Sequence, residues 1–461
     1  MEHRQSPIPR TTALSRRTLL TGAAVGSAAV GLSLWTRPAR GAGSTTYFVD
    51  PAAGDDADDG TVPTRPWASM ARVNAALTAS TIAPGSTVRL RRGRRHPGVI
   101  RPGTVGALRF ESWGDEPEPP VVTAYKYVQA AACWTRAGDG LWSVDISAAN
   151  VGRTHHGYVS SWTTEVGFLK VGSTLHGDRK TDPSALVRDW QFTSRGSVVT
   201  VRCATNPSAG GRRVWLAVAD PIVEVRSGLS VRDLAVVGTG RNAVQTTSAS
   251  RTDGAVVRDC IIGEAGGALA SDGVSRMGNG VQVWSGASGV LVSGNTIVDC
   301  WDAAMTIQGP GVSKGVSWSD VEFTGNSVER TMQTFEYWST GGTESAGSST
   351  CSVRGNRAHD AGSSWSAAVR PDRAGKGSHL LFYADGVRPR LAVRGNDFSG
   401  AAHAYLYAHD GVPAGLTSDE NTIALADSVR LQWQRSERLP EHRAWSAATG
   451  LEHRSTFTSL P

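Results

Sequence analysis

One short phrase recurs in the second half of the chain and decides its fold. Residues 351–356 read CSVRGN and residues 391–396 read LAVRGN: alternating apolar residues followed by a glycine–asparagine turn. Phrases of this kind end in asparagine or aspartate and supply six anchors: Asp233, Asp259, Asn295, Asn326, Asn356 and Asn396. The anchors are 26, 36, 31, 30 and 40 residues apart, so loops of variable length interrupt a constant unit.

The repeated unit predicts a coil with one turn per repeat. Each unit holds two or three strands of about five residues with polar turns between them. Such a piece cannot bury its apolar face alone, whereas stacked pieces form one continuous core. The unit is too short and its period too uneven for the blades of a propeller. Asparagine suits the turn because it tolerates a left-handed backbone and can hydrogen-bond along the stack.

The composition agrees with many short strands. The 461 residues include 53 glycines and 15 tryptophans, and 19% are charged, which excludes a highly charged disordered chain. The net charge is +6, but residues 1–42 contain six arginines and one acidic residue. The remaining charge is close to zero, so we expect no nucleic-acid partner.

The first 42 residues resemble an export signal. Arg16 and Arg17 directly precede an apolar run, residues 19–34, and small residues near Gly41 suit a signal peptidase. A membrane anchor is the alternative, but no later stop-transfer segment follows. A twin-arginine signal implies export of the folded protein. The mature chain is therefore expected to be secreted or extracytoplasmic and free of the membrane.

The opening of the mature chain carries a family resemblance. Residues 47–60 read YFVDPAAGDDADDG, and Pro66 and Trp67 follow. This resembles the start of secreted right-handed parallel β-helix proteins of the pectin-lyase-like superfamily. The similarity continues in residues 85–93, 278–284, 302–308, 335–338 and 370–383. The resemblance implies an all-β, right-handed parallel β-helix, but the superfamily includes lyases, hydrolases and phage tailspikes.

The rest of the chain is arranged around this fold. We expect a helix at residues 67–77 to cap the N-terminal end of the coil, and an inserted β-rich segment because residues 125–220 lack the repeat. The predicted segments are a signal peptide (1–42), a cap with first coils (43–124), the insertion or irregular coils (125–220), the β-helix repeats (221–410), and a last coil with a polar tail (411–461).

Asp302 and Glu336 are the predicted catalytic pair. Each lies in an apolar or aromatic stretch, where a carboxylic acid tends to stay protonated, as a general acid requires. On adjacent rungs they would approach the ~5 Å separation of a retaining pair, and a loop between them could widen it towards an inverting pair. The alternative is structural: Asp302 caps a turn and Glu336 pairs with an arginine such as Arg370.

A polar loop at residues 370–379 provides the candidates for elimination. In a uronate, one group must neutralise the substrate carboxylate and another must remove the C5 proton. The basic side chains Arg370, Arg373, Lys376 and His379 could supply both roles, as basic residues do in lyases of the family that the chain resembles. The candidates for substrate contacts in this loop are Arg370, Asp372, Lys376 and His379. The alternative is a solvated surface loop.

Other residues are predicted to contact a sugar chain, because acids and amides bind hydroxyls and flat rings stack on pyranose faces. They are Arg276, Asn279, Gln308, Tyr337, Trp338, Trp365, His403 and Tyr405. The expected partner is a polysaccharide or oligosaccharide, cleaved by a hydrolase or a lyase. A non-catalytic glycan-binding protein is the alternative.

The sequence predicts no metal site and no required cofactor. The five cysteines have no ligand spacing and are expected to be buried small hydrophobes. Asp55 to Gly60 is rich in acids but departs from the calcium-loop pattern, which leaves weak calcium binding open. We expect a monomer.

Overall fold

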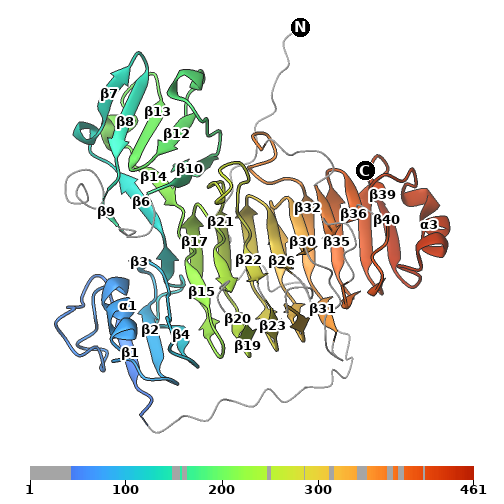
Figure 1. Cartoon of the computed structure of the whole chain (residues 1–461), viewed down its shortest axis with the longest axis horizontal. Helices are drawn as coiled ribbons and strands as arrows, with labels where there is room; N and C mark the ends of the chain where they lie inside the picture. The colour runs from blue at the N-terminus through green and yellow to red at the C-terminus, as the bar shows by residue number, and fades with distance from the viewer. Residues whose placement is uncertain are drawn as a thin grey trace. The chain divides into compact units, whose positions relative to one another are not determined.

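The computed structural model describes residues 43–147, 156–157, 164–246, 251–284, 286–310, 316–339, 350–370, 377–382, 389–408 and 411–461. The proposed signal peptide lies outside these residues. Three long parallel sheets dominate the structure (Figure 1). Successive strands of the chain pass from sheet to sheet, as β24, β25 and β26 do, so each turn of the coil adds one strand to each sheet.

The strands of the three sheets, in their order along each sheet, are as follows. Sheet A contains β1 (Thr46–Val49), β2 (Thr87–Arg91), β4 (Arg109–Trp113), β16 (Ser230–Arg232), β20 (Val256–Arg258), β24 (Leu291–Ser293), β28 (Glu322–Thr324), β31 (Cys351–Arg354), β34 (Leu391–Arg394) and β37 (Leu416–Asp419). Sheet B contains β3 (Arg95–Pro97), β5 (Val121–Thr123), β17 (Ala235–Thr239), β21 (Ile261–Ala265), β25 (Thr296–Cys300), β29 (Ser327–Glu329), β32 (Arg357–Ala361), β35 (Asp397–Ala401), β38 (Thr422–Ala426) and β40 (Thr456–Leu460). Sheet C contains β15 (Val223–Val225), β18 (Val244–Thr246), β22 (Val281–Trp284), β26 (Ala303–Gly309), β30 (Gln333–Ser339), β33 (Ser378–Phe382), β36 (Ala404–Ala408) and β39 (Arg430–Gln432).

The three sheets enclose one core. Val292 of sheet A, Ile297 of sheet B and Ile307 of sheet C are fully buried in the same apolar cluster. Their neighbours along each strand point outwards, because side chains alternate across a strand. The predicted right-handed parallel β-helix is confirmed.

A ladder of asparagines joins the later coils. The Nδ2 groups of Asn295, Asn326, Asn356 and Asn396 each donate to Oδ1 of the next ladder residue at 2.9–3.0 Å, and the series continues to Asn421. The same Oδ1 atoms also accept the backbone N–H of the preceding asparagine at 2.9–3.0 Å. The expected hydrogen bonding of turn asparagines along the stack is therefore confirmed.

The alignment that the sequence predicts for the early anchors, Asp233 and Asp259, with the later asparagines is wrong by one residue. Cys260 N donates to Oδ1 of Asn295 at 3.0 Å, so Asn295 stands level with Cys260 and not with Asp259. Asp259 corresponds to Gly294, and both have a positive φ, of 55° and 65°. Aspartate in early coils and glycine in later ones thus occupy the left-handed position of the turn, and the ladder residue comes next.

Both ends of the coil are covered. Helix α1 (Met70–Thr78) begins after Ser69, whose Oγ accepts the Arg72 N–H at 3.0 Å, and its buried side chains join the core. At the other end, helix α3 (His442–Thr449) buries Trp445 completely. β40 pairs in parallel with β38, so the last residues form part of sheet B.

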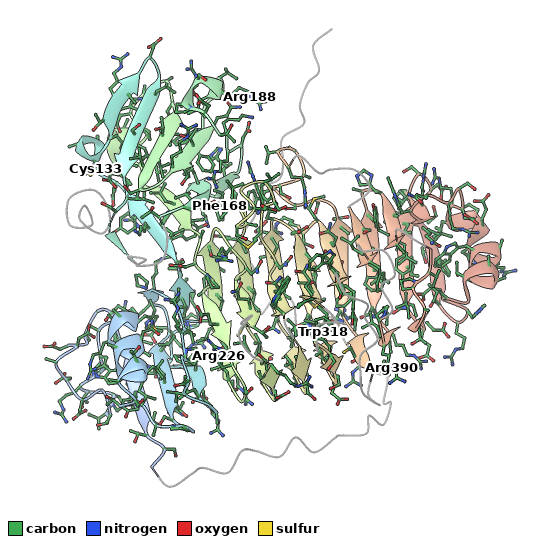
Figure 2. All side chains as sticks on the ribbon, viewed as in Figure 1. Cys133, Phe168, Arg188, Arg226, Trp318 and Arg390 are labelled. Carbon is green, nitrogen blue, oxygen red and sulfur yellow. The ribbon has the colours of Figure 1, made fainter. Side chains whose placement is uncertain are left out.

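The insertion is built from two antiparallel sheets that share a separate core. The first contains β6 (Tyr125–Val128), β9 (His156–Gly157), β10 (Val166–Val171), β11 (Thr174–His176) and β14 (Val214–Val218). The second contains β7 (Thr135–Gly138), β8 (Leu141–Asp145), β12 (Phe192–Arg195) and β13 (Val198–Arg202). Cys133 and Arg188 lie on this insertion (Figure 2).

All five cysteines are free, and Cys203, Cys260, Cys300 and Cys351 are buried as expected. Burial raises the pKa of the Cys260 and Cys351 thiols to about 12, so they remain protonated at neutral pH. Among the residues that the structure describes, no helix has the length and apolar character needed to cross a membrane.

Replacing Asn356 by alanine should cost about 3 kcal/mol or more of unfolding free energy, because buried partners lose their hydrogen bonds. The lost bonds involve Asn326, Asn396 and the Phe323 carbonyl, at 2.9–3.0 Å. Urea unfolding followed by circular dichroism measures the change. Ser352→Ala, on the outer side of the same coil, is the control and should change stability little. Equal stability of the two variants would contradict a supporting role for the ladder.

Candidate functional site

The outer face of sheet C gathers amides, aromatic rings and one carboxylate. Gln282, Thr306 and Glu336 occupy one position on three adjacent strands, β22, β26 and β30. Two residues further on, Trp284, Gln308 and Trp338 form a second row. The residues between these rows, such as Ile307 and Tyr337, belong to the core. Parallel register therefore collects on one face side chains that are distant in sequence.

Two aromatic pairs lie on this side of the coil. The rings of Trp284 and Trp338 stack with centroids 5.8 Å apart and an interplanar angle of 24°. Towards the C-terminal end, Tyr407 and Trp433 stack at 5.2 Å and 18°. Trp284, Trp338 and Trp433 are half-buried, and each ring is held in place by its partner.

A hydrogen-bonded row of side chains leads to Glu336. Nε2 of Gln282 donates to Oε1 of Gln308 at 2.5 Å, and Nε2 of Gln308 donates to Oε2 of Glu336 at 2.8 Å. Gln308 and Glu336 retain exposures of 9% and 6%. The carboxylate is thus held in one orientation and largely shielded from water, which strengthens its electrostatic interactions.

The structure does not bring Asp302 and Glu336 together as a pair. They lie on adjacent rungs, but Glu336 stands level with Thr306, four residues after Asp302. Four residues of strand correspond to about 13 Å, far beyond the ~5 Å of a retaining pair. Asp302 instead accepts a hydrogen bond from Nη1 of Arg370 at 3.1 Å. The arginine that the alternative assigned to Glu336 therefore pairs with Asp302.

Arg276, Arg370 and Trp365 surround Trp301, and two of them, Arg276 and Trp365, contact the insertion. The Arg276 guanidinium lies 4.9 Å from the Trp301 ring centroid and donates to the carbonyls of Gly177 and Arg179 at 3.1 and 2.9 Å. Trp365 packs against Phe168 of the insertion and donates to the Asp299 carbonyl. These contacts anchor the insertion on the β-helix.

Four other candidates face the interior. Tyr337, His379 and Tyr405 are at most 1% exposed, and the Tyr405 hydroxyl donates to Glu452 at 2.7 Å. His379 packs against Phe398 and lies 3.0 Å from the Thr334 hydroxyl, so the described structure does not place it where a base could meet a polysaccharide. Asn279 accepts the Ala303 N–H at 3.1 Å and supports a turn.

The remaining candidates have separate outcomes. His403 is exposed. Asp372, Arg373 and Lys376 lie outside the described residues, so their roles in substrate binding and in elimination remain predictions. Within the described ranges, no group of three histidine, cysteine, aspartate or glutamate side chains is placed to hold a metal ion.

Sequence reasoning found Gln308, Glu336 and Trp338 but missed Gln282, Trp284, Thr306, Tyr407 and Trp433. The residues level with Glu336 come 11 positions after Asn295, 10 after Asn326, 25 after Asn356 and 11 after Asn396. The distance from an anchor to this row therefore differs between coils, so no fixed count along the sequence finds all of its residues. The alternation of apolar and polar residues along each strand of sheet C is the sequence signal that could have identified the missed residues.

Comparisons with known proteins support the fold. No protein-family model and no curated protein sequence matches the chain. Among solved structures, XylC in complex with xylose is similar over 84% of this chain and 70% of its own, at 12% identity and a TM-score of 0.52. The GH136 lacto-N-biosidase from Eubacterium ramulus matches over 90% of this chain and 68% of its own, at 12% identity and a TM-score of 0.38. The similarity to XylC, at this identity, shows a shared fold, the parallel β-helix.

The buried His379 makes the folding stability of the protein depend on pH. Burial lowers the pKa of its imidazole to about 3, below the ordinary value of 6.5, so the unfolded chain binds a proton that the folded chain does not. Stability is therefore lost as pH falls from about 6.5 towards 3. His379→Gln should flatten this loss in urea midpoints measured between pH 7 and 4. The exposed His403 provides the control, His403→Gln, and identical pH profiles for the two variants would contradict the assignment.

Proposed function

We propose that the outer face of sheet C binds a saccharide chain and that Glu336 transfers a proton during cleavage of a glycosidic bond. The observation that carries this proposal is the stacked Trp284–Trp338 pair beside the hydrogen-bonded row from Gln282 to Glu336. Flat rings pack against the apolar faces of pyranoses, while amides and a carboxylate bind their hydroxyls. A shielded carboxylate next to such a surface is suited to acid–base work.

The charge of these strands favours a neutral glycan and hydrolysis. The described strands β22, β26, β30, β33 and β36 contain no lysine or arginine. Elimination from a uronate requires a cation near the substrate carboxylate, and these strands do not supply one; the candidate Lys376 precedes β33 and lies outside the described residues. A neutral sugar needs only the rings and hydrogen-bonding groups that the face presents.

The two aromatic pairs favour a chain that runs along the coil axis. Neighbouring rungs are about 4.8 Å apart, a spacing close to the advance of one pyranose in an extended chain. Trp338 lies on β30 and Trp433 directly follows β39, three rungs further along sheet C. An oligosaccharide of about four or more residues could therefore touch both pairs. XylC, a protein of the same fold, was solved with xylose.

Glycan binding without cleavage is the second candidate. It is favoured because Glu336 is the one acidic residue in the described strands β22, β26, β30, β33 and β36, whereas most glycoside hydrolases use two carboxyl groups. A second group would have to come from another part of the chain. The assay below separates the two candidates.

Glu336→Gln should lower turnover at least about 100-fold and leave oligosaccharide affinity nearly unchanged, because the amide keeps the shape and removes the titrating group. The mature protein is incubated with neutral and uronate-containing polysaccharides, following new reducing ends and the ultraviolet absorbance of unsaturated uronates. Glu322→Gln, on the outer side of sheet A, is the matched control and should retain full activity.

Each outcome of this assay has a definite meaning. Reducing ends without the absorbance support hydrolysis, and reducing ends with it would overturn the choice of hydrolysis over elimination. Full turnover by Glu336→Gln would remove Glu336 from the chemistry. Binding by a wild-type protein that cleaves no glycan in the panel would support the second candidate.

Trp338→Ala should weaken binding of short and long oligosaccharides about tenfold, because a stacked ring contributes roughly 1 kcal/mol or more. Trp433→Ala should weaken only chains long enough to reach the second pair. Isothermal titration with a series of increasing chain length measures both effects. Equal losses for a disaccharide in the two variants would contradict the proposed direction of the chain.

A further inference from the structure

The side-chain amides on sheet C form a chain with a single direction. Oδ1 of Asn242 accepts the backbone N–H of Asn279 at 2.8 Å, so Nδ2 of Asn242 is the group left to donate. It donates to Oε1 of Gln282. Because that oxygen accepts, Nε2 of Gln282 is directed to Oε1 of Gln308. Nε2 of Gln308 then faces Oε2 of Glu336.

Both ends of the chain enforce this direction. A backbone N–H can only donate, and an ionised carboxylate can only accept. Each amide between these ends must therefore present its oxygen towards Asn242 and its nitrogen towards Glu336. Reversing one amide would set two oxygens or two N–H groups against each other. Hydrogen bonds aligned in one direction also polarise one another and strengthen the last of the series.

We propose that Asn242, Gln282 and Gln308 are positioning residues that hold the ionised carboxylate of Glu336 in one orientation. This inference rests on the proposed function for the role of Glu336, but the chain itself acts on the carboxylate with or without substrate. The hydrogen bond from Gln308 stabilises the charged form, and Gln282 prevents Gln308 from rotating away. This chain of hydrogen-bonded side chains spans four coils, from the turn before β18 to β30.

In the described strands β22, β26, β30 and β33, the titratable side chains other than Glu336 are Tyr337 and His379, and both face the core. Asp302 and Arg370 pair with each other near the start of β26. Within this part of the chain, Nε2 of Gln308 is a donor placed directly on the Glu336 carboxylate.

Gln245 provides a matched control within the same network. Its Oε1 accepts from Nδ2 of Asn242 at 3.0 Å, so it is a side branch that does not lie on the path to Glu336. It is level with Gln282 on the neighbouring strand β18. Replacing Gln245 or Gln282 by methionine thus removes the same type of side chain from the same row.

The titration of Glu336 tests the inference directly. The full mature chain is labelled with carboxyl-13C glutamate, and the signal absent from Glu336→Gln is followed with pH in the absence of substrate. Gln308→Met should raise the titration midpoint by about 0.5 to 1 pH unit, because the charged form loses a donor. Gln282→Met should raise it by a smaller amount, and Gln245→Met should leave it unchanged. Thermal unfolding of each variant shows whether the fold is retained.

The result separates this inference from the proposed function. Equal midpoints for Gln308→Met and Gln245→Met in folded proteins would overturn the positioning role, even if wild-type protein cleaves glycans. A rise confined to Gln308→Met and Gln282→Met would support it, even if no glycan is cleaved. In an active enzyme, the acid limb of the kcat/KM profile should move to higher pH by the same amount.

Discussion

Parallel hydrogen bonding between coils is the interaction on which the rest of the structure depends. It holds successive rungs about 4.8 Å apart, so a residue on one coil stands directly over its counterpart on the next. The asparagine ladder from Asn295 to Asn421 fixes this spacing at one corner, where backbone donors would otherwise be buried without partners. The same register aligns the side chains on the outer face of sheet C into rows.

The molecule uses directed amide chains twice. Inside the coil, the ladder donates from each asparagine to the next, and Asn421 donates to both carboxylate oxygens of Glu452 at 3.2 and 3.0 Å. On the outer face, the amide chain from Asn242 ends at Glu336. A carboxylate suits the end of such a series because it only accepts hydrogen bonds. Glu452 ends its chain within the C-terminal end of the coil, whereas Glu336 ends its chain beside aromatic rings.

The insertion shows how a separate unit is attached without interrupting the coil. Its two sheets have their own core, and its contacts with the β-helix include polar and aromatic groups. Glu264, for example, accepts from the Tyr125 hydroxyl at 2.9 Å and pairs with Lys170. Trp365 and Arg276 add ring and carbonyl contacts. Residues that resembled sugar-binding groups in the sequence thus serve to attach this unit.

Local pattern was sufficient for the fold. The alternating phrase with its glycine–asparagine turn predicts short strands, and the need to bury their apolar sides predicts stacking. The helix after Ser69, the inserted β-rich segment and the buried cysteines also follow from local sequence. Each of these features depends on neighbours within one repeat or on simple burial.

The candidate site depended on long-range register. The first residue of the strand in sheet C comes from seven to 22 positions after its anchor, because loops of different length precede these strands. The sequence therefore predicted Asp302 and Glu336 as a pair on adjacent rungs, although Glu336 stands level with Thr306, four residues after Asp302. Likewise, sequence alone does not show that His379 points inwards while Glu336 points outwards. The sequence determined that these strands would stack; only the tertiary structure decided which side chains meet, since cross-strand pairing joins residues that local spacing leaves unrelated.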